Sequence, residues 1–241
     1  MSAPRIVSLV PSITELLCDL DLSEQLVGRT GFCIHPWETV REIPKVGGTK
    51  DLKFDRIREL EPTHVVVNVD ENRKEDAEAL AEFIPNVVVT HPLGPRDNLD
   101  LYRQMGREFD RQAEAEALCR RFEAALSRVE DRPEQNVLYL IWRDPWMTIS
   151  PETYISQTLG LFNWRTVPAT TDERYPQVDL REVEVDRVLL SSEPFHFKEA
   201  HVPEVEALVP GAEVSLIDGE MTSWYGSRAI AGLDYLREYT K

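Results

Sequence analysis

Short apolar runs alternate with amphipathic stretches along most of this chain. Runs such as RIVSLV at residues 5–10 and THVVVNV at residues 63–69 are rich in branched apolar residues, so they predict buried strands. Stretches with helical spacing of apolar residues follow these runs, and the alternation predicts parallel α/β sheets. The predicted strands are residues 5–10, 26–30, 63–69, 86–90, 136–142, 187–192 and 213–218, with a short extended piece at residues 45–49. The two glycines of VGGTKD at residues 46–51 predict a turn there.

The stretches between these runs predict helices. Ser12 and Glu15 have the spacing of a capping box, which places the start of the first helix near Ser12. The other helices predicted within the two α/β stretches are residues 53–60, 73–83, 151–162, 180–185, 201–208 and 228–239.

Residues 97–131 interrupt the alternation and have a helical pattern only. Apolar residues recur every four positions at Leu101, Met105 and Phe109, and again over residues 118–126. This pattern predicts a short helix followed by a long one over residues 111–129, which would span roughly 30 Å. We therefore predict two Rossmann-like α/β lobes, residues 1–96 and 132–241, joined by residues 97–131, which contain connecting helices including a long backbone helix.

Charge excludes some classes of partner. The 241 residues include 27 Lys and Arg against 43 Asp and Glu, a net charge of -16. A surface this acidic repels nucleic acid and anionic membranes, and no basic stripe in the sequence offsets the repulsion. Three cysteines do not make the count of a disulfide framework, and no apolar run approaches the ~20 residues of a membrane span.

Aromatic and charged residues gather directly after the predicted strands. Ligands of open α/β sheets bind beyond the carboxyl ends of the strands, and aromatic side chains there suit a large flat ligand. Two interpretations stay open: the aromatic side chains cap the two cores, or they line a ligand cleft. We adopt the second, and the predicted ligand-binding residues are Phe32, His35, Trp37, Thr49, Trp142, Arg143, Trp146, Glu193, Phe195, Trp224, Tyr225 and Arg228.

The residue types predict which part of the ligand each side chain contacts. Trp142, Trp146 and Trp224 are predicted to stack on the ligand, because stacking rewards flat apolar faces. Arg143 and Arg228 are predicted to hold carboxylates, amides or phosphate at its edges.

Candidate metal ligands are few, and catalytic motifs are missing from the sequence. Cys33 and His35 have a C-x-H spacing, and His91 and His196 also follow strands. We predict no protein-bound metal and no catalytic residues, because the chain lacks a G-x-S-x-G elbow, a P-loop, a G-x-G-x-x-G after a strand and an H-E-x-x-H helix. A metal-dependent enzyme that uses Cys33, His35 and His196 is kept as an alternative.

Several segments together resemble one family. They are RIVSLVPSITELL at the start, GGTKDLKFDRIRELEPTHVVV in the first lobe, TYISQTLGLFNW and RVLLSSEPF in the second lobe, and DGEMTSWYGSR near the end. With the long central helix, they resemble the class III, or helical-backbone, substrate-binding proteins of ABC importers, of the cobalamin- and siderophore-binding type. The resemblance covers nearly the whole chain.

The resemblance implies that the ligand lies between two lobes, which close little because a continuous helix joins them. It also implies that each lobe presents an acidic residue to the membrane permease, and the matching residue of the first lobe is Asp55. In the second lobe the matching place is Arg181, so the adjacent Glu182 is the predicted docking residue. Thr49 stands where the cobalamin binder of this type has a tryptophan.

We therefore predict the substrate-binding protein of an ABC importer, not an enzyme, which binds a corrinoid such as cobalamin or a ferric siderophore and has no covalently bound cofactor. Its predicted partners are the permease and a small metal chelate, not nucleic acid, and it is predicted to be a monomer. The family works in the periplasm or an equivalent space. No signal peptide is recognisable in this sequence, so the alternative is a cytoplasmic cofactor-handling or sensing protein on the same fold.

Overall fold

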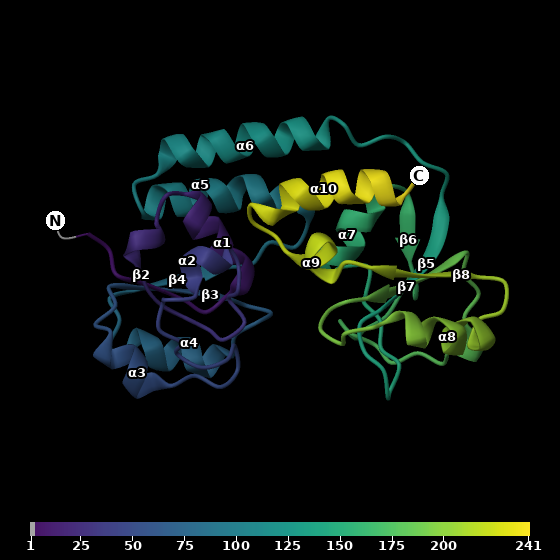
Figure 1. Ribbon diagram of the computed structural model, residues 1–241, viewed down its shortest axis with the longest axis horizontal. Coiled ribbons are helices and arrows are strands. Elements are labelled where there is room, and N and C mark those ends of the chain that lie inside the picture. Colours follow the sequence, from purple (N-terminus) through teal and green to yellow (C-terminus); the bar gives the residue numbers. More distant parts are fainter. Residues whose placement is uncertain (1–2) are drawn as a thin grey trace. The chain divides into compact units, whose positions relative to one another are not determined.

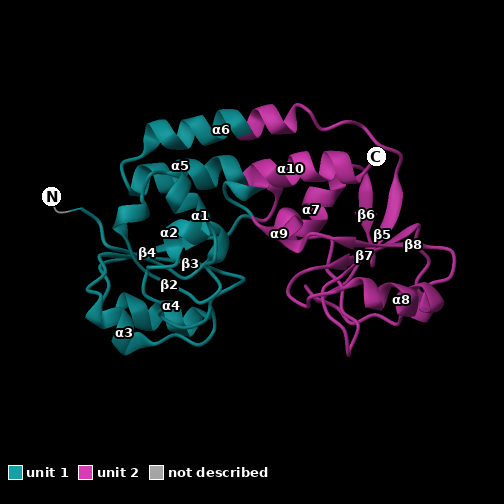
Figure 2. Ribbon diagram, in the orientation of Figure 1, with its two compact units in different colours: residues 1–92, 98–121, 225–228 teal, residues 93–97, 122–224, 229–241 magenta. Residues whose placement is uncertain are grey.

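The computed structural model describes residues 3–241 and divides into two compact units (Figure 1, Figure 2). Unit 1 contains residues 1–92, 98–121 and 225–228, and unit 2 contains residues 93–97, 122–224 and 229–241. Each unit has one parallel sheet of four strands. Helix α6 (Gln112–Leu126) begins in unit 1 and ends in unit 2 (Figure 2).

The unit 1 sheet has the strand order β2-β1-β3-β4. Helices α3 and α4 lie on one side of it, and α1 and α5 lie on the other (Figure 1). Valines on alternate positions of β1 and β3, such as Val7 and Val65, pack against Ile57 of α3 and Leu80 of α4 in one buried cluster. The elements are β1 (Ile6–Ser8), α1 (Pro11–Asp19), η1 (Ser23–Gln25), β2 (Leu26–Arg29), α2 (Trp37–Val40), α3 (Phe54–Glu59), β3 (His64–Asn68), α4 (Lys74–Ala81), β4 (Asn86–Thr90) and α5 (Asn98–Glu108).

The unit 2 sheet has the order β6-β5-β7-β8, the same order as in unit 1. Leu138 and Leu140 of β5 and Val188 of β7 pack with Val205 of α8 on one face, and α7, α9 and α10 lie on the other side (Figure 1). The elements are η2 (Pro95–Asp97), β5 (Gln135–Leu140), α7 (Tyr154–Gly160), β6 (Trp164–Thr166), η3 (Leu180–Glu182), β7 (Arg187–Ser191), η4 (Glu199–His201), α8 (Val202–Leu208), β8 (Glu213–Ile217), α9 (Gly219–Ser223) and α10 (Arg228–Tyr239).

The predicted fold class, two α/β lobes with a long helix between their sequences, is confirmed, but several elements differ. Residues 45–49, predicted as a short extended piece, form only two isolated bridges. The chain turns back at Gly48, whose N–H donates to Asp51 O at 2.9 Å, in the turn predicted over residues 46–51. Strand β6 and the short helices α2 and α9 were not predicted. The predicted helix 180–185 is reduced to one 3₁₀ turn, and α6 ends at Leu126 instead of residue 129.

The predicted capping box at the start of the first helix is wrong. Helix α1 begins at Pro11, whose fixed φ suits the first helical position, and Val10 takes the N-cap position without a side-chain hydrogen bond. Glu15 instead accepts hydrogen bonds from Arg228. Among the described residues no helix combines the length and the hydropathy of a membrane span.

Tyr139 of β5 is a large polar side chain that is fully buried. It is 0% exposed, its hydroxyl donates to Ser191 Oγ at 2.9 Å, and it shares a 2.6 Å hydrogen bond with Thr222 Oγ1. Burial raises the pKa of Tyr139 far above the usual value of a tyrosine. The phenol therefore stays protonated in the folded protein at pH values where an unfolded chain ionises.

Replacing Tyr139 with Phe should lower the free energy of unfolding by about 1–2 kcal/mol at pH 7, because Ser191 and Thr222 lose a buried partner. A raised pKa in the folded state gives stability that is present below pH ~10 and is lost as pH rises above that value. The variant should therefore lose less stability than the parent between pH ~9 and ~11. Urea denaturation at three pH values measures the free energy of unfolding of both proteins. If this free energy falls equally with pH in the parent and in the variant, the buried, protonated phenol is contradicted.

Candidate ligand-binding site

The carboxyl ends of the four parallel strands form one edge in each sheet. In each sheet the second strand in chain order pairs with one side of the first strand, and the third strand pairs with its other side. The points at which the strand order reverses therefore lie between β1 and β3 and between β5 and β7. Ligands of open α/β sheets bind at such points.

A loop rich in aromatic residues follows β2 in unit 1. Phe32 is 63% exposed and Trp37 is 52% exposed, while Cys33 between them is fully buried. His35 is half-buried in the same loop. Two large apolar side chains are therefore held in solvent beyond the end of a strand, which is the exposure expected of a ligand platform rather than of a core.

Buried Arg29 fixes this loop, a role that no pattern in the sequence indicated. Arg29 is 1% exposed, and its Nε donates to Val40 O at 2.6 Å. Its Nη1 donates to the carbonyl oxygens of Thr30 and Cys33 at 3.1 and 3.0 Å. The guanidinium thus ties both ends of the loop to one point, so Phe32 is presented by a rigid backbone.

The turn with Thr49 is linked to the end of β3. Asn72 Nδ2 donates to Thr49 O at 3.0 Å, and Asn72 Oδ1 accepts from the N–H of Asn68 at 2.9 Å. Glu71, between these asparagines, accepts a 2.6 Å hydrogen bond from the hydroxyl of Tyr225. Burial first, and then the Glu71 charge, raise the pKa of Tyr225 well above its usual value, so this phenol is a hydrogen-bond donor.

Residues 225–228 are built into unit 1 by four contacts. Besides the Tyr225 bond, the N–H of Gly226 donates to Asn98 Oδ1 at 2.6 Å, and Tyr102 donates to Gly226 O at 2.9 Å. Arg228 donates to both carboxylate oxygens of Glu15, at 2.7 and 2.8 Å. This bidentate pair engages the Arg228 guanidinium that was predicted to hold the ligand.

The unit 2 edge is dominated by the loop after β5. Trp142 is 41% exposed and meets Phe195 edge-on at 5.8 Å. Trp146 stacks on the buried ring of Phe197, with centroids 6.2 Å apart and an interplanar angle of 7°. Trp142 therefore offers an open face, while Trp146 has one face occupied by the core.

Arg143 between the two tryptophans is also paired. Its Nε and Nη2 donate to the Glu204 carboxylate at 3.1 and 3.0 Å, and its Nη1 donates to Asp144 at 3.0 Å. These bonds raise the pKa of Arg143, with the Glu204 hydrogen bonds as the main cause. The geometry holds the guanidinium between two acids.

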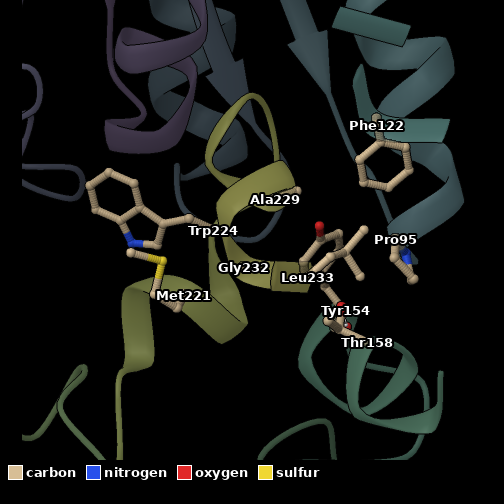
Figure 3. Close-up of a pocket in the computed structure, with 9 residues that line it drawn as sticks. All are labelled: Pro95, Phe122, Tyr154, Thr158, Met221, Trp224, Ala229, Gly232 and Leu233. Atoms are coloured by element: carbon tan, nitrogen blue, oxygen red, sulfur yellow. Dashed lines mark hydrogen bonds between the residues drawn. The ribbon is translucent and has the colours of Figure 1, made fainter. Parts of the chain in front are cut away.

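Trp224 is more buried than its place in the sequence suggested. It is 9% exposed, and its Nε1 donates to Glu193 Oε2 at 3.0 Å, so Glu193 orients the indole. Trp224 and Met221 lie on one side of a narrow crevice, and Phe122 and Pro95 lie on the other (Figure 3). The crevice has no room for a water molecule, so it is part of the packing and not a ligand cavity.

The structure divides the predicted residues between the two units. Phe32, His35, Trp37, Thr49, Tyr225 and Arg228 belong to unit 1, and Trp142, Arg143, Trp146, Glu193, Phe195 and Trp224 belong to unit 2. Asp55 and Glu182 are both exposed, on α3 and η3, and their docking role stays a prediction. A hollow of about 520 Å³ in unit 2 contains none of the predicted residues and is lined by Leu93, Gly94, Pro95, Arg96, Asp97, Glu152, Gln157, Leu161 and Arg174.

The candidate metal ligands do not converge. Over residues 3–241, no group of three or more His, Cys, Asp and Glu side chains is placed to hold a metal ion. The thiol of Cys33 shares a 3.1 Å hydrogen bond with Thr30, and burial raises its pKa, which disfavours the thiolate that a metal requires. The geometry therefore does not favour the metal-dependent enzyme.

Two four-stranded parallel sheets of the same order, with a helix continuing from one unit into the other, define a helical-backbone substrate-binding protein. A family model described as periplasmic binding protein matches residues 6–184. Because the match covers most of the sequence, the chain belongs to this family of solute-binding proteins, as its class III resemblance predicted.

Two vitamin B12-binding proteins are distant relatives of this chain in sequence. The Vitamin B12-binding protein of Vibrio parahaemolyticus is 22% identical over 183 residues, which cover 74% of this chain and 66% of that protein. The Vitamin B12-binding protein of Vibrio campbellii is 24% identical over 186 residues, which cover 75% of this chain and 67% of that protein. This chain thus spans about two thirds of the length of these relatives.

Solved structures share the fold over nearly the full chain. The periplasmic vitamin B12 binding protein BtuF of Vibrio cholerae has a TM-score of 0.83 at 16% identity, covering 99% of this chain and 96% of that one. The periplasmic heme binding protein HutB of Vibrio cholerae has a TM-score of 0.81 at 21% identity, covering 99% of both chains. These likenesses confirm the predicted fold class.

Proposed function

We propose that this chain is the substrate-binding protein of an ABC importer and captures a flat metal chelate, a corrinoid in the first place, outside the cytoplasmic membrane. The observation that supports this most is the exposure of large aromatic side chains at both carboxyl edges, with Phe32 at 63%, Trp37 at 52% and Trp142 at 41%. A macrocycle offers wide apolar faces, and stacking on preoriented rings costs little ordering entropy. The relatives named for vitamin B12 support the corrinoid.

The rigid support of these rings also favours binding over catalysis. Arg29 ties down the loop that holds Phe32, and Phe195 contacts Trp142 edge-on. A binding surface held in one conformation suits a protein that must capture a scarce ligand and release it unchanged.

Equilibrium dialysis against dicyanocobinamide, followed by its visible absorbance, tests the proposal. The parent should retain the corrinoid, and Trp142→Ala should bind it roughly 10- to 100-fold more weakly, because an exposed stacking face is lost. Trp142→Phe is the matched control, since it keeps an aromatic face and should retain most of the affinity. Absence of corrinoid binding by the parent, or equal affinity of Trp142→Ala, would contradict the proposal.

A further inference from the structure

The arginines at the two edges are engaged by the protein's own acids. The side chains of Arg228 and Glu15 are only 12% and 18% exposed and form a bidentate pair in unit 1. In unit 2, Arg143 is held between Glu204 and Asp144. A guanidinium that already has a carboxylate on its fork must exchange that partner before it can bind a ligand carboxylate.

Most charged side chains in the loops that follow the strands are acidic. Two acids of these loops, Glu71 and Glu193, accept hydrogen bonds from the neutral donors Tyr225 and Trp224, so their negative charges are not balanced by these partners. The charged residues within about five positions after β3, β5, β7 and β8, histidine aside, are Asp70, Glu71, Arg73, Arg143, Asp144, Glu193, Asp218 and Glu220.

Other basic residues near the carboxyl ends of the strands do little to offset this excess of negative charge. Lys50, on the turn after Gly48, is exposed and is a single ammonium on a flexible stem. His91 of unit 1 lies 3.7 Å from Asp70, so its positive charge, when present, is already shared with an acid of the same edge. The net charge of -16 adds a background of the same sign.

On the basis of the proposed function, we propose that the ligand has no net negative charge and that its rim carries neutral amides instead of carboxylates. An amide donates through its N–H to side chains such as Glu71 and Glu193 without bringing a like charge near them. A carboxylate rim would place negative charges beside fixed acids, where the effective dielectric is far below that of water. Amide-rimmed corrinoids fit this class, whereas porphyrins with propionates and polyanionic ferric chelates do not.

A pair of corrins with the same ring and metal tests this inference directly. Dicyanocobinamide has amides on its rim, and dicyanocobyrinic acid has carboxylates at the same positions. The parent should bind the acid roughly 30-fold or more weakly than the amide at low salt. Raising the ionic strength from about 0.02 to 0.5 M should narrow this ratio, because salt screens repulsion between exposed charges.

The variants Glu71→Gln and Glu193→Gln identify the groups responsible. Each keeps an oxygen that accepts from Tyr225 or Trp224 and removes one negative charge, so each should narrow the amide-to-acid ratio several-fold. Equal binding of the two corrins, or tighter binding of the acid, would overturn the charge inference and leave the chelate-binding proposal intact. If neither corrin binds, it is the proposed function that fails.

Discussion

Replacing Glu15 with Ala should lower the free energy of unfolding by about 2–3 kcal/mol, because the mostly buried guanidinium of Arg228 loses its bidentate carboxylate. The pair closes a contact between residues 213 positions apart, and its two hydrogen bonds of 2.7 and 2.8 Å have the bidentate geometry of a strong ion pair. Urea denaturation followed by circular dichroism measures the loss.

Arg103 and Glu116 supply the matched control for this prediction. They form a two-point pair through Nε and Nη2, at 2.8 and 3.4 Å, but their side chains are 38% and 48% exposed. Glu116→Ala should therefore leave the unfolding midpoint almost unchanged, since solvent replaces the lost partner. If Glu15→Ala and Glu116→Ala lose similar unfolding free energy, burial does not determine how much the Glu15 pair contributes to stability.

A double variant separates the net stability that the ion pair contributes from the destabilisation caused by removing only one partner. Glu15→Leu combined with Arg228→Met removes both charges and keeps apolar volume, so much of the stability lost in Glu15→Ala should return. If the double variant stays as unstable as Glu15→Ala, the pair itself contributes net stability, and the loss does not come from removing the carboxylate beside a buried guanidinium.

Replacing Gly47 with Ala should destabilise the protein by about 3 kcal/mol or more and weaken corrinoid binding. Gly47 has a φ of +115°, and a Cβ there would lie 2.1 Å from the backbone oxygen of Asp51. Backbone cannot move aside as a flexible side chain can, so strain and overlap add. Because Gly31 N–H donates to Gly47 O at 2.8 Å, the displaced turn would also disturb the loop of Phe32.

Two other glycines separate the strain from the overlap. Gly211 has a φ of +98° with nothing within 4 Å of its Cβ position, so Gly211→Ala should cost only about 1 kcal/mol. Gly160 also has open space and no positive φ, so an alanine there should be neutral or stabilising by up to ~1 kcal/mol. Thermal denaturation of the three variants should rank them in this order. A Gly47→Ala loss no larger than that of Gly211→Ala would rule out the overlap with Asp51.

Much of the fold could be predicted because β1, β3, β5 and β7 are continuous apolar runs, as expected of strands buried on both faces. Strand β6 was missed because Trp164–Thr166 is short and has the exposed Arg165 at its centre. Its place in the sheet depends on pairing with β5, which is a contact distant in sequence.

The exposure of several aromatic candidates could be predicted from the sequence, whereas the polar contacts of the candidate residues could not. Aromatic residues after strands could be read directly from the sequence, and Phe32, Trp37 and Trp142 are exposed as a ligand surface requires. The partner of Arg228 could not be predicted, since Glu15 is at the other end of the chain. Arg29 resembles any surface arginine until the surrounding carbonyl oxygens are known.

The assignment of residues 225–228 to unit 1 bears on how the protein is made. Asn98, Tyr102 and Glu15 all receive their partners from a segment close to the carboxyl terminus. During synthesis the first sheet can form early, yet these contacts become available only after residues 225–228 have been translated. A fragment that ends before residue 225 would lack these hydrogen bonds, so unit 1 is not assembled from the residues before 225 alone.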